Sequence, residues 1–125
     1  MTKLKNAFTL IELMVVVSIA AILFSIATVT YSNVTKSSRD ARKKADLEAI
    51  RQALELYRST CGAYPSAPLD TSIACGTQTY MSSLPKDPKT GDNYVYATTT
   101  SGYDLTATLE NNCSGATCTY TVKNP

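Results

Sequence analysis

The sequence of 125 residues contains no histidine and no Cys-x-x-Cys pair. Structural and catalytic zinc sites are usually built from such cysteine pairs and from histidines. The nucleophile elbow of hydrolases and the glycine-rich phosphate loop of nucleotide-binding proteins are missing as well. These absences argue against an enzyme. The acidic residues of the predicted strand region lie close together in sequence, but that alone does not make a catalytic pair.

Proline and glycine are absent before Gly62. Because these two residue types are the main helix breakers, a helix that begins near Phe8 meets no break for more than fifty residues. At 1.5 Å per residue, such a helix is roughly 80 Å long. The segment "CGAYP" is the predicted stop, since Gly62 suits the position after a helix end and Pro65 cannot continue a helix.

Charged side chains are missing from Leu13 to Thr35. The apolar part, Leu13 to Val29, is interrupted by three small polar residues, namely Ser18, Ser25 and Thr28. Counted from Phe8, the segment reaches about 20 residues, which is enough to cross the hydrocarbon core of a bilayer. We therefore expect a helix that spans a membrane.

Glu12 stands at the leading edge of this apolar segment. A cleaved secretory signal peptide and a plain membrane anchor are the ordinary interpretations of such a segment, and neither explains an acid there. An ionised carboxylate within hydrocarbon costs about 2.5–3.5 kcal/mol on insertion scales. Glu12 therefore predicts a partner of opposite charge. A carboxylate that stays hydrated at the membrane edge is the alternative.

The second half of the predicted helix is amphipathic. Its apolar residues recur at steps of three and four, in the order Leu47, Ile50, Leu54 and Tyr57, with Ala53 beside them. Charged residues fill the other positions. This spacing places the apolar side chains on one face, which we expect to pack against another part of the same chain.

Basic residues cluster in "KSSRDARKK", residues 36–44, where Asp40 interrupts them and Asp46 and Glu48 follow. Helix segments with charges of both signs are usually solvated. We therefore expect this stretch to form a water-exposed helix surface just outside the membrane. Contact with anionic lipid headgroups or with DNA is the alternative.

The remainder of the chain predicts a loop region followed by strands. Four of the five prolines fall between Pro65 and Pro88, so residues 61–92 are expected to be loop-like, with room for a short helical turn. From Asn93 the pattern has period two: "NYVYATTTSGYDLTATLE" predicts two strands joined at Ser101-Gly102, and "CTYTVKN" predicts a third. The expected fold is α+β, with a small antiparallel sheet packed on the amphipathic half of a long N-terminal helix.

The sequence has four cysteines, Cys61, Cys75, Cys113 and Cys118. An even number in a small exported domain favours disulfides and an oxidising compartment. Three connectivities are possible, and we predict Cys61–Cys75 and Cys113–Cys118 because each closes a local loop. Free buried thiols are the alternative.

The segment "AFTLIELMVVVSIAAIL" resembles the N-terminus of type IV prepilins, which include type IV pilins, type II secretion pseudopilins and their competence-system relatives. The resemblance implies that a membrane peptidase cuts the bond between Ala7 and Phe8 and that Phe8 is then N-methylated. Ala7 departs from the glycine that is usual before the cut. The resemblance also implies that Glu12 pairs with a terminal amine during assembly.

The implied protein is a non-catalytic subunit of a helical homo-oligomeric filament in the inner membrane, with one membrane span and its C-terminal domain outside the cytoplasm. The implied partners are the prepilin peptidase, a platform membrane protein, an assembly ATPase and further copies of the chain, and no nucleic acid is expected. The chain then divides into a leader (1–7), a membrane and filament-core helix (8–30), its amphipathic continuation (31–60), a loop region (61–92) and an antiparallel sheet with a disulfide loop (93–125).

Three further segments, "CGAYP", "LPKDPKTGDNYVY" and "YDLTATLEN", resemble the major-type pseudopilins of type II secretion. The absence of a proline late in the apolar helix leans the same way. Those proteins carry a calcium site in a Gly/Asp-rich C-terminal loop, for which the sequence shows no counterpart. No cofactor is therefore expected, and calcium bound by Asp92 and Asp104 is a weaker alternative.

A second function from a different class is a membrane-anchored minor pilin that binds DNA or a surface ligand. Its candidate contacts are the tyrosines of the C-terminal part, namely Tyr64, Tyr80, Tyr94 and Tyr96. Tyrosines in such a pattern are more often core or sheet-face residues. A filament-forming protein and a monomeric ligand-binding protein are distinguished by their assembly behaviour.

Overall fold

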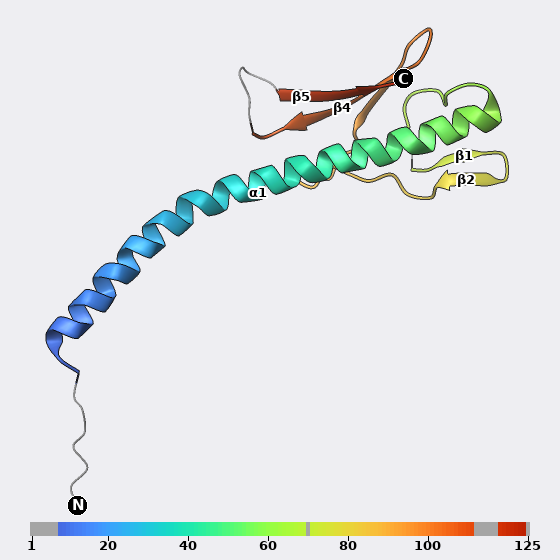
Figure 1. Cartoon of the computed structure of the whole chain (residues 1–125). Coiled ribbons are helices and arrows are strands. Elements are labelled where there is room, and N and C mark those ends of the chain that lie inside the picture. The colour runs from blue at the N-terminus through green and yellow to red at the C-terminus, as the bar shows by residue number, and fades with distance from the viewer. Residues whose placement is uncertain (1–7, 70, 112–117, 125) are drawn as a thin grey trace, which may run out of the picture. The chain divides into compact units, whose positions relative to one another are not determined.

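The computed structural model describes residues 8–69, 71–111 and 118–124. Its elements are α1 (Leu10–Cys61), β1 (Ile73–Cys75), β2 (Gln78–Met81), β3 (Val95–Thr98), β4 (Tyr103–Leu109) and β5 (Cys118–Lys123). The predicted α+β fold with a long N-terminal helix is confirmed (Figure 1). The chain divides into an N-terminal unit, Met1–Thr35, and a C-terminal unit, Lys36–Pro125, which we call the head.

In the N-terminal unit, α1 exposes its large apolar side chains, including Leu13, Ile19 and Phe24. An 18-residue stretch of α1 reaches a mean hydropathy of 2.6 and none of it is buried, so by length and composition the helix is able to cross a membrane. The hydroxyl of Ser18 donates to the carbonyl of Met14 at 2.7 Å. This bond satisfies the polar side chain within its own helix, as an apolar surrounding requires.

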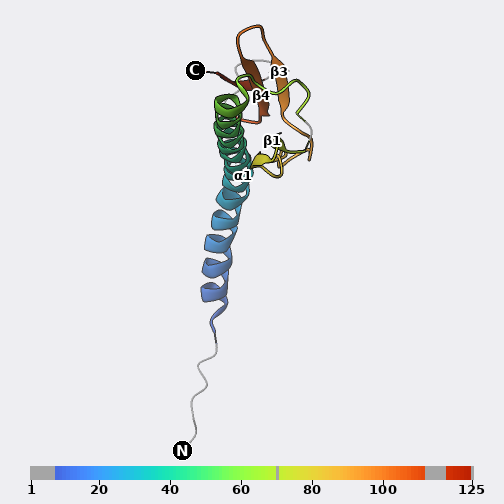
Figure 2. The same ribbon diagram turned by 90° about the vertical axis from the view of Figure 1, so that its right-hand side faces the viewer.

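The core of the head forms where α1 meets the strands. The predicted apolar stripe is confirmed, since Leu47, Ile50 and Leu54 are fully buried. They share one cluster with Ile73 of β1 and Leu105 of β4. Figure 2 shows β1 and β3 on the same side of the head part of α1. Both sheets therefore pack against the same face of α1.

The described strands of the C-terminal part form an antiparallel sheet in the order β3–β4–β5. Along β4 the side chains of Tyr103, Leu105 and Ala107 are buried, whereas those between them are more exposed. This alternation was predicted from the period-two pattern. It follows from the pleat of a strand, which points successive side chains to opposite faces.

The β3–β4 hairpin turns one residue earlier than predicted. Thr99 and Gly102 exchange backbone hydrogen bonds of 2.9 and 3.4 Å, so the two turn residues are Thr100 and Ser101 rather than Ser101 and Gly102. Gly102 is buried beside the side chain of Asn124, and a Cβ at this position would overlap that side chain. The glycine is therefore needed for close packing rather than for the turn itself.

Residues 61–92, expected to be loop-like with room for a helical turn, contain a short antiparallel hairpin in which β1 and β2 pair. Gly76, with φ of 60°, provides the left-handed conformation between the two strands. The hairpin attaches to the end of α1: Tyr80 donates its hydroxyl to Thr60 Oγ1 at 2.6 Å, and its ring meets Tyr57 edge-on. Prolines on both sides of such short strands concealed them from pattern analysis.

The predicted disulfide between Cys61 and Cys75 is present and joins the last residue of α1 to the last residue of β1. It closes a loop with a sequence separation of 14 residues. Cys113 lies outside the described residues, so the pairing of Cys113 with Cys118 stays a prediction.

Replacing Cys61 and Cys75 together by serine is expected to lower the free energy of unfolding of the head by about 3 kcal/mol, because the unfolded chain gains the freedom of the opened loop. Thermal unfolding followed by tyrosine near-ultraviolet circular dichroism, with the full chain in detergent micelles, measures this change. Wild-type protein and the double variant should unfold alike once both are treated with a thiol reductant, which also opens the predicted Cys113–Cys118 disulfide. Equal stability of the variant and untreated wild type would contradict the prediction.

Candidate assembly segment and head clasp

The first turn of α1 is closed by a capping box made of Thr9 and Glu12. Thr9 precedes the first helical residue, and its backbone N–H and its hydroxyl donate to Glu12 Oε2 at 2.9 and 2.8 Å. The N–H of Glu12 donates in return to Thr9 Oγ1 at 3.4 Å. The carboxylate thus lies at the helix N-terminus, where the helix dipole favours a negative charge.

The bond expected to be cut precedes this capping box. Ala7 lies outside the described residues, and Phe8 is exposed and stands before the helix begins. Phe8 and Glu12 are four residues apart, which is about one helical turn. An amine on Phe8 would therefore be close in sequence to the carboxylate of Glu12, whose hydrogen bonds are made to Thr9.

A second polar cluster, which we call the head clasp, connects α1 to the end of β4 and to the segment before β3. Its members are Arg39, Asp40, Lys43, Asp87, Lys89 and Glu110. The expectation that residues 36–44 form a solvated surface is wrong for Asp40 and Lys43, since both are buried. Two charged residues that were expected at the surface therefore lie in the interior of the head.

Asp40 links α1 to the end of β4 by accepting two hydrogen bonds from backbone N–H groups. Its two carboxylate oxygens accept the N–H groups of Glu110 and Asn111, each at 2.8 Å. The side chain is 6% exposed. Since backbone N–H groups that leave water need acceptors, the carboxylate of Asp40 supplies them at the point where β4 ends.

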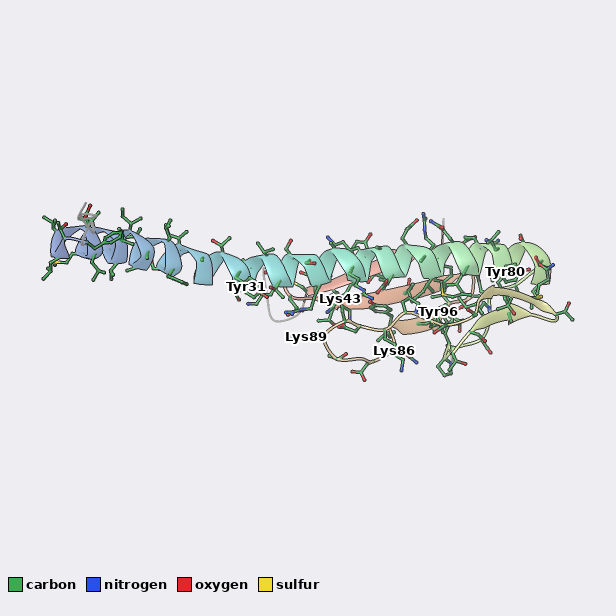
Figure 3. All side chains as sticks on the ribbon, turned by 90° about the horizontal axis from the view of Figure 1, so that it is seen from below. Tyr31, Lys43, Tyr80, Lys86, Lys89 and Tyr96 are labelled. Atoms are coloured by element: carbon green, nitrogen blue, oxygen red, sulfur yellow. A yellow bond between two sulfur atoms is a disulfide. The ribbon has the colours of Figure 1, made fainter. Side chains whose placement is uncertain are left out.

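Lys43 is the most deeply buried charge of the clasp, at 2% exposed. Its Nζ donates to the carbonyl of Thr108 at 2.7 Å and lies 2.9 Å from Asp87 Oδ2. In Figure 3, Lys43 lies between α1 and the strands. Burial alone would raise the pKa of Asp87, but Lys43 and the backbone N–H groups of Lys89 and Thr90 outweigh it and hold that pKa below its usual value.

Glu110 ends the clasp with two cations around one carboxylate. Arg39 binds it in a bidentate manner, with Nε and a terminal nitrogen at 2.7 and 2.8 Å. Lys89 Nζ lies 3.2 Å from the same group, which is 9% exposed. The hydrogen bonds from Arg39 outweigh burial and, with those from Lys89, lower the pKa of Glu110 from 4.5 to about 2.

This low pKa predicts a loss of stability in acid. A carboxylate whose pKa is lower in the folded state contributes stability above its unfolded value, near 4.5, and loses it as the pH falls toward 2. We expect the melting temperature of the head to fall across this window and Glu110→Gln to flatten the fall. Melting curves at pH 7, 4.5, 3.5 and 2.5 test this, with Glu48→Gln as the control, because Glu48 is a more exposed acid that pairs with Arg51. A Glu110→Gln curve parallel to that of wild type would refute the assignment.

The four tyrosines of the alternative binding surface belong to the head instead. Tyr96 is buried and donates its hydroxyl to the carbonyl of Pro65 at 2.8 Å, and burial raises its pKa to about 12. Tyr94 donates to Asp46 Oδ2 at 2.8 Å, and burial with this bond raises its pKa as well. Tyr64 and Tyr80 pack against the core. These side chains stabilise the fold and do not form an exposed aromatic platform.

The two acids of the calcium alternative lie on different elements. Asp104 is on β4, with Oδ1 3.6 Å from Lys123 Nζ, and Asp92 is exposed before β3. Within residues 8–69, 71–111 and 118–124 there is no group of three or more acidic or cysteine side chains placed to hold a metal ion. Calcium binding at Asp92 and Asp104 stays a prediction.

Comparison with known families places both clusters in context. Residues 2–28 match the sequence profile described as "Prokaryotic N-terminal methylation motif", which includes Thr9 and Glu12. Residues 30–121 match the profile described as "Type II secretion system (T2SS), protein G", which includes the whole clasp. The chain belongs to the type II secretion system protein G family. It is a pilin-like structural subunit of a secretion pseudopilus, as the resemblance of its N-terminus implied. No solved structure matches the chain.

For this protein G family member, the sequence pattern identified the N-terminal methylation motif, whereas it did not reveal the clasp. A signal for the clasp was present in the spacing: Asp40 and Lys43 precede Leu47 by seven and four residues. Residues at these steps share one helix face, so both charges continue the buried stripe toward the N-terminus. Their polarity made the continuation look like solvated surface.

Proposed function

We propose that the protein is cut between Ala7 and Phe8, methylated at Phe8 and assembled into a helical filament of identical subunits through its apolar helix. The match of residues 2–28 to the N-terminal methylation motif is the observation that carries this proposal. The exposed apolar surface of α1 in the N-terminal unit supports it, because such a surface needs either lipid or other helices around it.

Glu12 gives the assembly its register in this proposal. Cutting before Phe8 creates a cationic amine, and the carboxylate of Glu12 pairs with the amine of a neighbouring subunit. In a low dielectric such a pair is much stronger than in water, although desolvation offsets much of the attraction. The larger effect is on specificity, since an incorrectly staggered neighbour leaves a carboxylate unpaired in an apolar bundle.

The Thr9 capping box holds Glu12 before assembly. Thr9 supplies a backbone N–H and a hydroxyl to the carboxylate, which reduces the cost of keeping an acid at the edge of the membrane. The incoming amine then competes with or joins these donors. Before assembly, the carboxylate of Glu12 is thus hydrogen-bonded within the first turn of its own helix while the subunit is in the membrane.

The partners follow from this course of events. The prepilin peptidase cuts and methylates the chain, a platform membrane protein and an assembly ATPase drive its incorporation, and the protein itself performs no catalysis.

The chain crosses the cytoplasmic membrane once. Basic residues alone would favour the opposite orientation, with Lys3 and Lys5 before the span and five cations in residues 36–44. The Cys61–Cys75 disulfide supports a head outside the cytoplasm, in an oxidising compartment.

The intact mass and the N-terminal residue of the mature protein test this proposal. A chain that begins with methylated Phe8 and retains α1 supports it. A chain that still carries residues 1–7 within the assembled filament, or one that has lost the whole apolar helix, overturns it. The same measurement on an Ala7→Gly variant provides the control for cleavage, because glycine is the usual residue before this bond in the resembled family.

A further inference from the structure

A hollow of about 300 Å³ lies at the end of the head where α1 stops. One wall is formed by the last turn of α1 and the residues that follow it, and the other wall is the turn that joins β3 to β4. Figure 2 shows this turn at the same end of the head as the last turns of α1. We call this hollow, with Arg58, Tyr64 and residues 98–101 as its polar lining, the tip cleft. It shares no residue with the clasp.

Arg58 brings a guanidinium without an acidic partner to the tip cleft. Arg39 and Arg51 are each bound by a glutamate, whereas no carboxylate of a described residue forms an ion pair with Arg58. A guanidinium carries its N–H donors in a planar fork, and one terminal nitrogen of Arg58 donates to the hydroxyl of Tyr64 at 3.0 Å. The other N–H groups are left for water or for a ligand.

Tyr64 holds this guanidinium in place. Arg58 Cζ lies 5.0 Å from the centroid of the Tyr64 ring. The ring itself packs edge-on against the buried Tyr103, with 4.8 Å between the ring centroids, and its hydroxyl donates to Glu55 Oε1 at 2.9 Å. Because Tyr64 is fixed by two neighbours, Arg58 is preorganised, and less side-chain entropy is lost when it binds a ligand.

The opposite wall of the tip cleft is rich in hydroxyl groups. Thr98, Thr99, Thr100 and Ser101 follow one another, border the cleft and are all exposed. The turn is closed by backbone hydrogen bonds between Thr99 and Gly102, so it does not need these hydroxyls. A hydroxyl both donates and accepts, as the hydroxyls of a sugar ring do. The cleft therefore combines a cation that suits a carboxylate with a surface that suits a sugar ring.

We propose that the tip cleft binds one unit of an acidic sugar, with its carboxylate on Arg58 and its ring hydroxyls on residues 98–101. A planar guanidinium binds a carboxylate through two parallel hydrogen bonds. The volume of the cleft is at the lower end of the range of about 300–1,000 Å³ for small-molecule sites, which suits a single ring. For so small a ligand at an open site, we expect a dissociation constant on the order of 1 mM.

The site belongs to the head of a single subunit and goes beyond the assembly role proposed above. In a filament of many subunits the weak sites would repeat, so that an acidic polysaccharide engages several of them at once and binds more tightly than a single unit. This consequence rests on the proposed function, whereas binding of one sugar unit does not.

The alternative role of Arg58 is structural. It lies in the last turn of α1, where the helix dipole favours a cation. A lysine serves that role as well, but it lacks the planar fork that binds a carboxylate at two points. Arg58→Lys therefore separates the two roles.

A titration followed by nuclear magnetic resonance tests the proposal on the full chain in uncharged detergent micelles. Glucuronate, glucose and acetate are added separately at matched ionic strength. The amides of Ala63 and Thr99 report on the cleft, and the amide of Gly91 is the reference outside it. We expect glucose and acetate to bind at least about tenfold more weakly than glucuronate, because each offers one of the two recognised groups. Unchanged amides up to about 20 mM glucuronate, or equal affinity for acetate, overturns the proposal.

Variants on both walls identify the groups that bind. Arg58→Gln and Arg58→Lys should each weaken glucuronate binding at least about tenfold, and Thr98→Val, which removes one hydroxyl and keeps the side-chain shape, about threefold. Arg42→Gln, which alters an exposed arginine of α1 outside the cleft, should leave binding unchanged.

Two results with these variants contradict the proposal. Wild-type affinity of Arg58→Lys would assign Arg58 to the helix end alone, and weaker binding by Arg42→Gln would show that net charge decides. Because the titration uses unassembled protein, a failure of cleavage or of filament formation leaves it unaffected, so the proposed function and the tip cleft are tested independently.

Discussion

Replacing Glu12 by alanine will leave the protein in the membrane but reduce filament yield at least about tenfold. Removing one partner of a buried, hydrogen-bonded charge pair costs about 2–5 kcal/mol, and each 1.4 kcal/mol is a factor of ten in an equilibrium. Insertion itself should become easier, because the variant carries no carboxylate into the apolar region. Filaments sheared from cells and the membrane-bound subunit are measured separately, so that the two effects are resolved.

Two controls accompany Glu12→Ala. Ser18→Ala alters a polar residue of the same helix whose hydroxyl is satisfied by Met14, and it should assemble like wild type. Thr9→Val removes the hydroxyl of the capping box but keeps the carboxylate, so it separates helix capping, worth about 0.5–2 kcal/mol, from charge pairing between subunits. Wild-type filament yield from Glu12→Ala would exclude the proposed role of this residue.

Replacing Lys43 by methionine will destabilise the head by about 3 kcal/mol, at the lower end of the 3–5 kcal/mol that follows from breaking a buried ion pair. Methionine retains much of the volume but leaves Asp87 without its cation and the carbonyl of Thr108 without its donor. Asp87 keeps the N–H groups of Lys89 and Thr90, which limits the loss. For a domain of 60–100 residues such a change lowers the melting temperature by roughly 12–24 °C.

The measurement is thermal unfolding of the full chain in detergent, followed by the circular dichroism of its eight tyrosines, since tryptophan is absent. The double variant Lys43→Met, Asp87→Asn should be more stable than Lys43→Met alone, because it removes the uncompensated carboxylate. Lys44→Met, which changes an exposed neighbour, should stay within about 0.5 kcal/mol of wild type. A Lys43→Met protein as stable as Lys44→Met would show that the clasp does not stabilise the head.

The sequence pattern reveals the special position of Glu12 but not that of Lys43. Glu12 is visible in the sequence because it is a single acid at the edge of an otherwise apolar run, and its meaning depends on local context alone. Lys43 stands among five basic residues and looks like the others. Its burial depends on Asp87 and Thr108, which lie more than forty residues away in the chain.

The missed hairpin has a different cause. The strands β1 and β2 are only three and four residues long, which is too short for a period-two pattern to emerge from a proline-rich segment. The hairpin depends on contacts that cross the chain: the disulfide to Cys61, the hydroxyl bond from Tyr80 to Thr60, and the burial of Ile73 against α1. By contrast, β4 has seven residues and alternates clearly enough to be predicted.

By itself the sequence determined the long helix, its division into an apolar and an amphipathic half, the processing motif, and the strands of the larger sheet. Each of these depends on residue spacing within one segment, so local periodicity suffices. Only the tertiary structure decided which charges are buried in the clasp, which remain exposed, and where the β1–β2 hairpin attaches. Those outcomes depend on partners such as Arg39 and Glu110, 71 residues apart, and only folding brings such groups within bonding distance.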